Sequence, residues 1–443
     1  MACPVARSAN QQCAKRPREH PPRRGFATDR HGQDARFARA PAQSIRTIGE
    51  RQAHLALPPQ LPLPIAEATA TLNSWLEIDL GALAHNAAAL RAAMGDSVEV
   101  IAVVKANAYG AGAAQFAAEL ERAGIPRFAA VWASEAVALR QAGITRPIIV
   151  LGHAFPADAS DAVAHGITLT CHSLALGQAL SEAATALGRT ATVHIKVDTG
   201  LHRFGVTLDE AVTLAAALRQ LPNLVVEGLT THMANADEPD DSFAETQQAL
   251  FAEAVQRLPW IPYRHTANSA TALRRSGLRY DGVRVGLALH GVLPPNSPGP
   301  KLSPVLTLRA RLARVAEVAR GEGVSYGLTW RAERPSRAGL VPVGYADGWR
   351  RGLGNVGSVL LDGQRCPMVG RVCMDQFLVD VTDLPSAREG CVVTLLGTEG
   401  DADITADEVA TEAGTISWDI LASLQARLPR LYVRNGMVES IVT

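Results

Sequence analysis

Eight short runs of apolar and β-branched residues recur along the middle of the chain, and they constrain its fold more than any other feature. Ala-rich segments with helical periodicity lie between them, for example 81–94, 112–123, 134–142, 174–187 and 208–221. The runs are 101–105, 128–132, 148–151, 167–171, 193–197, 224–230, 264–267 and 283–289. Strands that alternate with helices pair in parallel, and eight such units in about 230 residues have the size of a (β/α)8 TIM barrel. We therefore predict an α/β fold with this barrel over residues 74–304, and a doubly wound open sheet is the alternative.

A different pattern follows residue 305. Six further runs alternate or are continuously apolar, and turns rich in Gly, Asp and Pro separate them; they are 305–318, 339–345, 356–361, 366–374, 377–381 and 392–396. This pattern is typical of antiparallel strands. A mostly antiparallel β C-terminal domain is predicted for residues 305–443.

The first part of the chain is basic. Residues 1–53 hold eleven Lys and Arg against four acids, although the whole chain of 443 residues has a formal charge of zero. With the Pro-rich stretch 57–64, this composition predicts a disordered Arg/Pro-rich tail and linker over residues 1–70. A transit peptide and residues before the true start of translation are the alternatives. The segment has no apolar core of a secretory signal and no membrane span.

The six cysteines include no C-x-x-C pair, which with the missing signal favours reduced thiols and a cytoplasmic protein. Cys171 lies in an apolar run beside His172, and we interpret it as a small buried hydrophobe rather than a nucleophile. No metal site is predicted, because His232 has no second ligand at a helical spacing.

Polar residues follow several of the predicted barrel strands, at the end where such barrels build their sites. Lys105 ends the first run; partial burial would lower its pKa and let it form a Schiff base, and the alternative is a lysine paired with a carboxylate. Lys196 and Arg203 follow the fifth run, and two close cations need an anion. Ser269 and the pair Gly286-Leu287 mark the two strands after which such barrels often bind phosphate. Arg284 would face either the mouth or a helix.

Across nearly all of residues 74–443 the sequence resembles the alanine racemases, fold type III enzymes that use pyridoxal 5′-phosphate. Eight motifs in family order carry the resemblance. They are VVKANAYG (103–110), KVDTGLHRFG (196–205), LTTHMANAD (229–237), HTANS (265–269), VRVG (283–286), VSYG (324–327), GYADGW (344–349) and GRVCMDQ (370–376).

The resemblance implies a homodimer with shared active sites and a two-base mechanism. Lys105 would hold the cofactor and act as one base, and Tyr326 of the other subunit would be the second base. His232, linked to Arg284, would favour the tyrosinate. Arg284 would face the pyridine nitrogen and, because it keeps its proton, would leave that nitrogen largely unprotonated.

Further roles follow from the same resemblance. Arg203 would contact the phenolic oxygen of the cofactor and the substrate carboxylate, and Lys196 matches a position that the family often carbamylates. Phosphate-binding positions match Tyr109, Ser269, Gly286 and Leu287, the residue that approaches the substrate carboxylate matches Met374, and gate positions match Tyr345, Asp237 and Trp418.

Two residues depart from the family pattern. Ala111 stands where the family usually has His, and Trp418 stands where it usually has a Tyr that binds phosphate and forms the gate. We therefore expect an L-alanine/D-alanine racemase that supplies D-alanine for peptidoglycan and binds neither nucleic acid nor membrane. The alternatives are a racemase of another small amino acid such as serine, a fold type III decarboxylase, and a cofactor carrier.

Overall fold

A computed structural model describes residues 62–443. The predicted tail, residues 1–61, lies outside the described residues. The prediction of a disordered linker up to residue 70 is wrong for its last part, because β1 (Leu63–Pro64) and α1 (Ile65–Ala68) are ordered there. Strand β1 pairs with β22 (Met437–Val442), where Leu63 lies opposite Val438, and this pairing holds the segment against the sheet.

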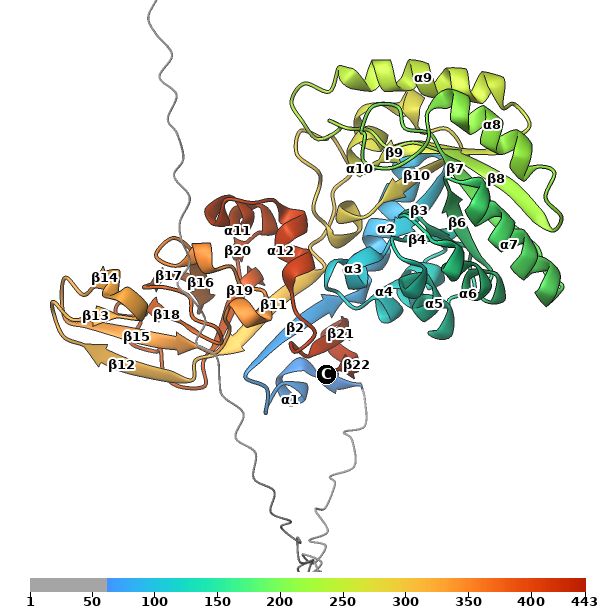
Figure 1. Ribbon diagram of the computed structural model, residues 1–443. Coiled ribbons are helices and arrows are strands. Elements are labelled where there is room, and N and C mark those ends of the chain that lie inside the picture. Colours follow the sequence, from blue (N-terminus) through green and yellow to red (C-terminus); the bar gives the residue numbers. More distant parts are fainter. Residues whose placement is uncertain (1–61) are drawn as a thin grey trace, which may run out of the picture. The chain divides into compact units, whose positions relative to one another are not determined.

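The predicted barrel is confirmed (Figure 1). Eight parallel strands close in the order β10-β3-β4-β5-β6-β7-β8-β9. Their bounds are β3 Glu99–Val103, β4 Arg127–Ala130, β5 Ile148–Val150, β6 Ile167–Cys171, β7 Ala191–Lys196, β8 Leu224–Thr230, β9 Tyr263–Asn268 and β10 Gly282–Val285. Each strand falls on one of the predicted runs, because strands covered by helices outside and packed inside must be apolar on both faces.

Helices connect the strands as the Ala-rich segments predict. They are α2 Leu80–Met94, α4 Ala113–Arg122, α5 Ala133–Gln141, α6 Ala159–Ala164, α7 Leu174–Leu187, α8 Leu208–Leu218, α9 Phe243–Arg257 and α10 Ser269–Arg274. Local signals set several starts: Thr207 accepts from the Glu210 amide and Glu210 accepts in return, a capping box that begins α8. No helix within residues 62–443 has the length and apolarity to cross a membrane.

A mixed sheet of twelve strands forms the second domain, and most of its neighbouring strands are antiparallel. Its strands from residue 306 onward are β11 Leu306–Arg311, β12 Arg314–Val318, β15 Ser336–Val341, β16 Ser358–Leu361, β17 Gln364–Val369, β18 Phe377–Asp380, β19 Val392–Glu399, β20 Ala402–Ile404, β21 Arg430–Arg434 and β22. A separate hairpin joins β13 (Gly323–Val324) and β14 (Trp330–Arg331). The helices α11 (Ala406–Ala413) and α12 (Ser417–Ser423) belong to the same part of the chain.

Two strands of this sheet, β1 and β2, come from before the barrel. Residues 74–79 form β2 (Ser74–Asp79), which pairs antiparallel with β11 and parallel with β21. The prediction that residues from 74 onward belong to the barrel is thus corrected for β2 (Figure 1). The chain runs from β2 directly into the first barrel helix, so local sequence does not reveal that the strand pairs with partners more than 220 residues away, such as Leu306 opposite Ile78.

Candidate active site

Lys105 follows β3 at the carboxyl end of the barrel strands. Its side chain lines a cavity and is partly buried. Burial lowers the pKa of Lys105, and the nearby charges of Arg203 and Arg284 lower it further, whereas Glu135 acts in the opposite direction. The amine therefore loses its proton more readily than a lysine in water does.

The backbone after Lys105 takes a rare conformation. Residues 106–109 all have positive φ values, between 51° and 54°, in the left-handed region that residues with side chains normally avoid. The Glu135 carboxylate accepts from the Ala106 amide at 2.7 Å, and the Asn107 side chain accepts from the Ala113 amide at 2.9 Å. This turn brings Lys105 and Tyr109 to the lining of one cavity.

Two adjoining cavities, of about 360 and 140 Å³, occupy the mouth of the barrel, and Lys105, Leu151, His232 and Arg284 line both. The larger cavity is also lined by Lys196 and Arg203. The smaller one contains the predicted phosphate-binding and gate positions Tyr109, Asp237, Ser269, Gly286, Leu287 and Trp418. The structure thus brings together eleven of the residues that the sequence analysis selected.

Arg284 is buried between strands and is held by six hydrogen bonds from its two terminal nitrogens. Their acceptors are the carbonyls of Thr231, His265 and Thr266, the Thr230 hydroxyl, and Nδ1 of His232 and His265. Burial lowers the pKa of Arg284 to about 10. Within residues 62–443 its Nε makes no hydrogen bond, so that donor is left for a group in the cavities that Arg284 lines.

His232 accepts from Arg284 at Nδ1 over 3.1 Å. Burial lowers the pKa of His232 well below its ordinary value, and the charge of Arg284 lowers it further. A neutral imidazole that accepts at Nδ1 carries its proton on Nε2. His232 can therefore donate one hydrogen bond to a partner at the cavity.

The smaller cavity has a glycine, Gly286, that lies directly against the Tyr109 side chain. A Cβ added at Gly286 would lie 2.3 Å from the Tyr109 hydroxyl oxygen. The Gly286 amide donates to Ser269 Oγ over 3.3 Å, so a hydroxyl and an amide from just after the neighbouring strands β9 and β10 meet there. Such a cradle of backbone N–H and hydroxyl groups suits a phosphate group, and a side chain at residue 286 would fill it.

The larger cavity is strongly cationic. Lys196 and Arg203 line it with Lys105 and Arg284, and no acidic residue of the described chain does so. Burial lowers the pKa of Lys196 to about 8, with Arg203 and Arg284 adding to the effect. Lys196 Nζ also lies 4.4 Å from the centre of the Phe204 ring. This charge pattern suits a ligand that carries carboxylate or phosphate groups.

Three of the predicted site residues lie elsewhere. Tyr326, Tyr345 and Met374 are in the β domain, line neither mouth cavity, and are 71%, 43% and 55% exposed. They belong to neighbouring segments, since the Tyr345 amide donates to the Cys373 carbonyl and Ser325 Oγ donates to the Arg371 carbonyl.

Sequence reasoning missed several residues of the mouth. His265 lay inside a quoted motif but received no role, although it contacts Arg284 twice. The rings of His153 and His172 contact each other near the larger cavity, with their centres 4.1 Å apart, and nothing in the local sequence links them. Cys171, by contrast, is buried as interpreted, and burial raises its pKa to about 11.

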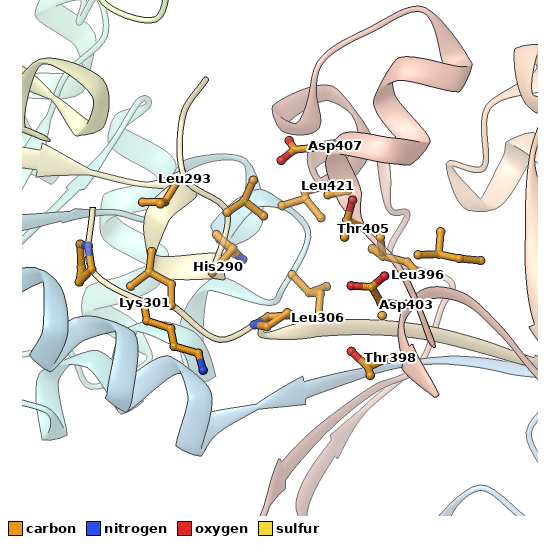
Figure 2. Close-up of a pocket in the computed structure, with 18 residues that line it drawn as sticks. His290, Leu293, Lys301, Leu306, Leu396, Thr398, Asp403, Thr405, Asp407 and Leu421 are labelled. Carbon is orange, nitrogen blue, oxygen red and sulfur yellow. The ribbon is translucent and has the colours of Figure 1, made fainter. Parts of the chain in front are cut away.

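A third cavity, of about 310 Å³, lies between the barrel and the β domain (Figure 2). His290, Leu293 and Lys301 face Thr405 and Asp403 across it. None of the predicted site residues lines it. His290 packs against Tyr109 at 5.4 Å between ring centres, so this cavity adjoins the smaller mouth cavity without sharing its reactive groups.

Comparisons with known proteins agree with this geometry. The model of the N-terminal domain of alanine racemase matches residues 78–294, and the model of its C-terminal domain matches residues 305–432. An alanine racemase of Desulfovibrio desulfuricans is 40% identical over 365 residues, which cover 81% of this chain and 98% of that protein. One from Geobacillus kaustophilus is 39% identical over 385 residues, which cover 83% and 97%.

Solved structures give the same result. The alanine racemase of Bacillus anthracis with bound L-Ala-P superposes with a TM-score of 0.77 at 37% identity, covering 84% of this chain and 97% of that one. A histidine racemase from Leuconostoc mesenteroides subsp. sake superposes with a TM-score of 0.76 at 29% identity, covering 82% and 98%. By its sequence, its two domains and the fold that carries Lys105, the chain belongs to the alanine racemase family of isomerases.

Proposed function

We propose that this protein binds pyridoxal 5′-phosphate in the barrel mouth and interconverts L-alanine and D-alanine, supplying D-alanine for peptidoglycan. The observation that carries the proposal is the presence of Lys105 and Arg284 in the same two cavities. A lysine of lowered pKa and a buried arginine with a free Nε line the same two cavities.

The residues of the mouth fit this cofactor. Lys105 would attach to its aldehyde, Arg284 Nε would donate to its ring nitrogen, and Arg203 would contact its phenolic oxygen. Tyr109, Ser269, Gly286, Leu287 and Trp418 line the smaller cavity, where they would bind the phosphate. When bound to an amino acid, the cofactor withdraws electrons from the Cα–H bond and makes that proton acidic.

The chain's own residues would then move the proton. Lys105 would exchange it on one face of Cα, and Tyr326 of the partner subunit would exchange it on the other. Arg203, with the backbone of Met374 of the partner subunit, would hold the substrate carboxylate. The exposure of Tyr326 and Met374 supports this arrangement, because both side chains are available to a second copy of the chain.

Arg284 argues against a decarboxylase. An acid opposite the ring nitrogen would stabilise a protonated ring and a strong electron sink, whereas a guanidinium only donates. Six hydrogen bonds, all donated by its terminal nitrogens, hold Arg284 in this position, and an ionised carboxylate could donate none of them. A weaker sink suits simple proton exchange.

The proposal also specifies which amino acid is the substrate. Trp418 lines the smaller cavity with Asp237, and its indole is bulkier than a phenol. The histidine racemase among the structural neighbours is of the same fold and acts, by its name, on a larger amino acid. We propose alanine, because the bulk of Trp418 favours a small side chain.

Lys196 is proposed to carry a carbamate. Its pKa of about 8 makes the neutral amine available to CO₂ near neutral pH, and the product would be an anion among three cations. Occupancy is expected to rise as the pH passes through 8. Native mass spectrometry across this pH range, with Lys301→Arg as a control and Lys196→Arg as the carbamate-free reference, tests the assignment; an unmodified Lys196 above pH 8 in bicarbonate contradicts it.

Chiral separation of products tests the function. The purified full chain, loaded with pyridoxal phosphate, is incubated separately with L-alanine, L-serine and L-histidine. Fast formation of D-alanine and slow formation of the other two D-isomers is expected. Preferential conversion of serine or histidine would reject alanine as the substrate, and release of CO₂ without racemisation would reject the racemase.

A further inference from the structure

A line of hydrogen bonds runs through the barrel interior from Arg284 toward the opposite rim. Arg284 Nη1 lies 2.8 Å from His265 Nδ1, His265 Nε2 lies 2.9 Å from His194 Nδ1, and His194 Nε2 lies 2.8 Å from Glu227 Oε2. Both imidazoles are fully buried. Branched apolar side chains usually fill such barrels, so a continuous polar line is a specific feature of this interior.

The two ends of the line fix the direction of every bond. A guanidinium only donates, and an ionised carboxylate only accepts. Since Arg284 donates to Nδ1 of His265, the proton of His265 is on Nε2, which donates to Nδ1 of His194. The proton of His194 is then on Nε2 and is donated to Glu227. Both histidines are thus neutral and protonated on Nε2.

The protonation states agree with this direction. Burial lowers the pKa of both His194 and His265, which keeps the two imidazoles uncharged. Burial alone would raise the pKa of Glu227, but hydrogen bonds from His194 and Arg127 outweigh it and lower that pKa to about 2. Glu227 is therefore the ionised end of the line.

The far end is anchored at the start of the strands. Arg127 donates to both oxygens of Glu227, at 3.0 and 3.3 Å, and through Nε to Glu99 at 3.2 Å. Two glycines leave room for the line: a Cβ at Gly228 would lie 2.6 Å from the His194 ring, and one at Gly282 would lie 2.2 Å from the Tyr263 hydroxyl, which donates to Glu99. Arg284 and Arg127 thus hold the two ends of the line, and the missing side chains of the two glycines leave space beside it.

We infer that Glu227 and His194 are positioning residues of the active site, which hold His265 in the tautomer that accepts from Arg284. The opposite tautomer would point the Nδ1–H of His265 at a donor of Arg284, and the guanidinium would have to turn. Its Nε would then no longer face the cavities. The consequence for catalysis rests on the proposed function, whereas the tautomers do not.

Nitrogen NMR of the ¹⁵N-histidine-labelled full chain without cofactor tests the tautomers directly. His194 and His265 are assigned by the loss of their signals in His194→Asn and His265→Asn. In the unsubstituted protein, Nε2 of both rings is expected to carry the proton and Nδ1 to be bare. A proton on Nδ1 of His265 would overturn the inference without any further variant.

Glu227→Gln tests the role of the carboxylate. The new amide nitrogen can donate to Nε2 of His194, whereas the carboxylate could only accept there. The proton of His194 would then lie on Nδ1 and be donated to Nε2 of His265, so part of the His265 population is expected to carry its proton on Nδ1. With cofactor, kcat for L-alanine is expected to fall by about 10- to 100-fold with little change in KM, the range seen when a group that orients a metal ligand is removed. Glu253→Gln, an exposed carboxylate on α9 that lies 3.6 Å from Arg257, is the matched control and should change neither.

The two proposals fail in different ways. If the tautomers are as expected but no amino acid is racemised, the proposed function fails and the line stands. If the protein racemises alanine and Glu227→Gln leaves both the His265 signals and kcat unchanged, the inference is wrong while the function stands.

Discussion

Lys105, Lys196 and Arg284 are three buried or partly buried basic groups in the mouth of the barrel. In water, Lys105 and Lys196 would both keep their protons near neutral pH, but burial and the charges of Arg203 and Arg284 lower the pKa of each. A lowered pKa makes an amine lose its proton more readily, and the neutral amine can bond to an aldehyde and can accept a proton. Arg284 keeps its charge because a pKa of about 10 still lies well above neutrality.

Replacement of Lys105 is the simplest test at this scale. Lys105→Arg keeps a positive charge but removes an amine that can lose its proton, so covalent attachment of the cofactor and racemisation in both directions should be lost. We expect activity to fall by at least about 10³-fold. Absorbance of the bound cofactor and chiral assays from each enantiomer measure the two effects. Lys301→Arg, an exposed lysine, is the control, and wild-type rates in Lys105→Arg would reject the assignment.

Tyr326 is assigned to one direction of the reaction only. Tyr326→Phe should bind the cofactor normally but should not remove the α-proton of L-alanine, because a phenyl ring cannot accept it. Exchange of the α-proton of D-alanine with deuterium from solvent should continue, since Lys105 is intact. Proton NMR of each enantiomer in D₂O separates the two exchanges. Equal exchange from both enantiomers would show that Tyr326 is not the second base.

At the scale of elements, the periodicity of the sequence predicted the barrel strands, but local sequence did not predict strand β2 or the turn after Lys105. The eight apolar runs fall on β3 to β10 because both faces of those strands are buried. The place of strand β2 in the second sheet was not predicted, because its partners β11 and β21 are distant in sequence. The left-handed turn at residues 106–109 was not predicted either, because three of its four residues are not types that favour positive φ.

In the candidate site, too, local sequence predicted some residues, whereas others depend on contacts between distant parts of the chain. Residues that follow barrel strands, such as Lys105 and Ser269, could be selected from sequence because parallel strands end at one rim. The line from His265 through His194 to Glu227 could not, because its members lie inside different strands and meet only when the barrel closes. The roles of Tyr326, Tyr345 and Met374 stay predictions.

The turn after Lys105 is tied to the C-terminal sheet, and this contact can be tested by stability. Tyr432 on β21 donates to the Ala111 carbonyl at 2.9 Å, and both groups are buried. Tyr432→Phe leaves that carbonyl without its donor and should lower the free energy of unfolding by about 1–3 kcal/mol. Urea denaturation measures it. Tyr280→Phe is the control, because the Tyr280 hydroxyl makes no hydrogen bond in the described chain; equal losses in the two variants would contradict the prediction.

For the molecule as a whole, the proposed reaction needs two copies of the chain. Lys105 lines the barrel mouth, whereas Tyr326 is 71% exposed and lines neither mouth cavity. A closed dimer would bring the β domain of each copy to the barrel of the other, and a two-fold axis would create two equal sites. Each site would then contain Lys105 from one copy and Tyr326 from its partner.

Mixed dimers distinguish this arrangement from a site built within one chain. Lys105→Ala and Tyr326→Phe are each expected to be inactive alone. After the two variants are unfolded together and refolded in equal amounts, half of the dimers contain one copy of each, and one of the two sites in such a dimer has both native residues. Racemase activity should therefore return to about one quarter of the wild-type value. If each chain carried its own complete site, every chain in the mixture would still lack one base, and activity would stay at the level of the separate variants.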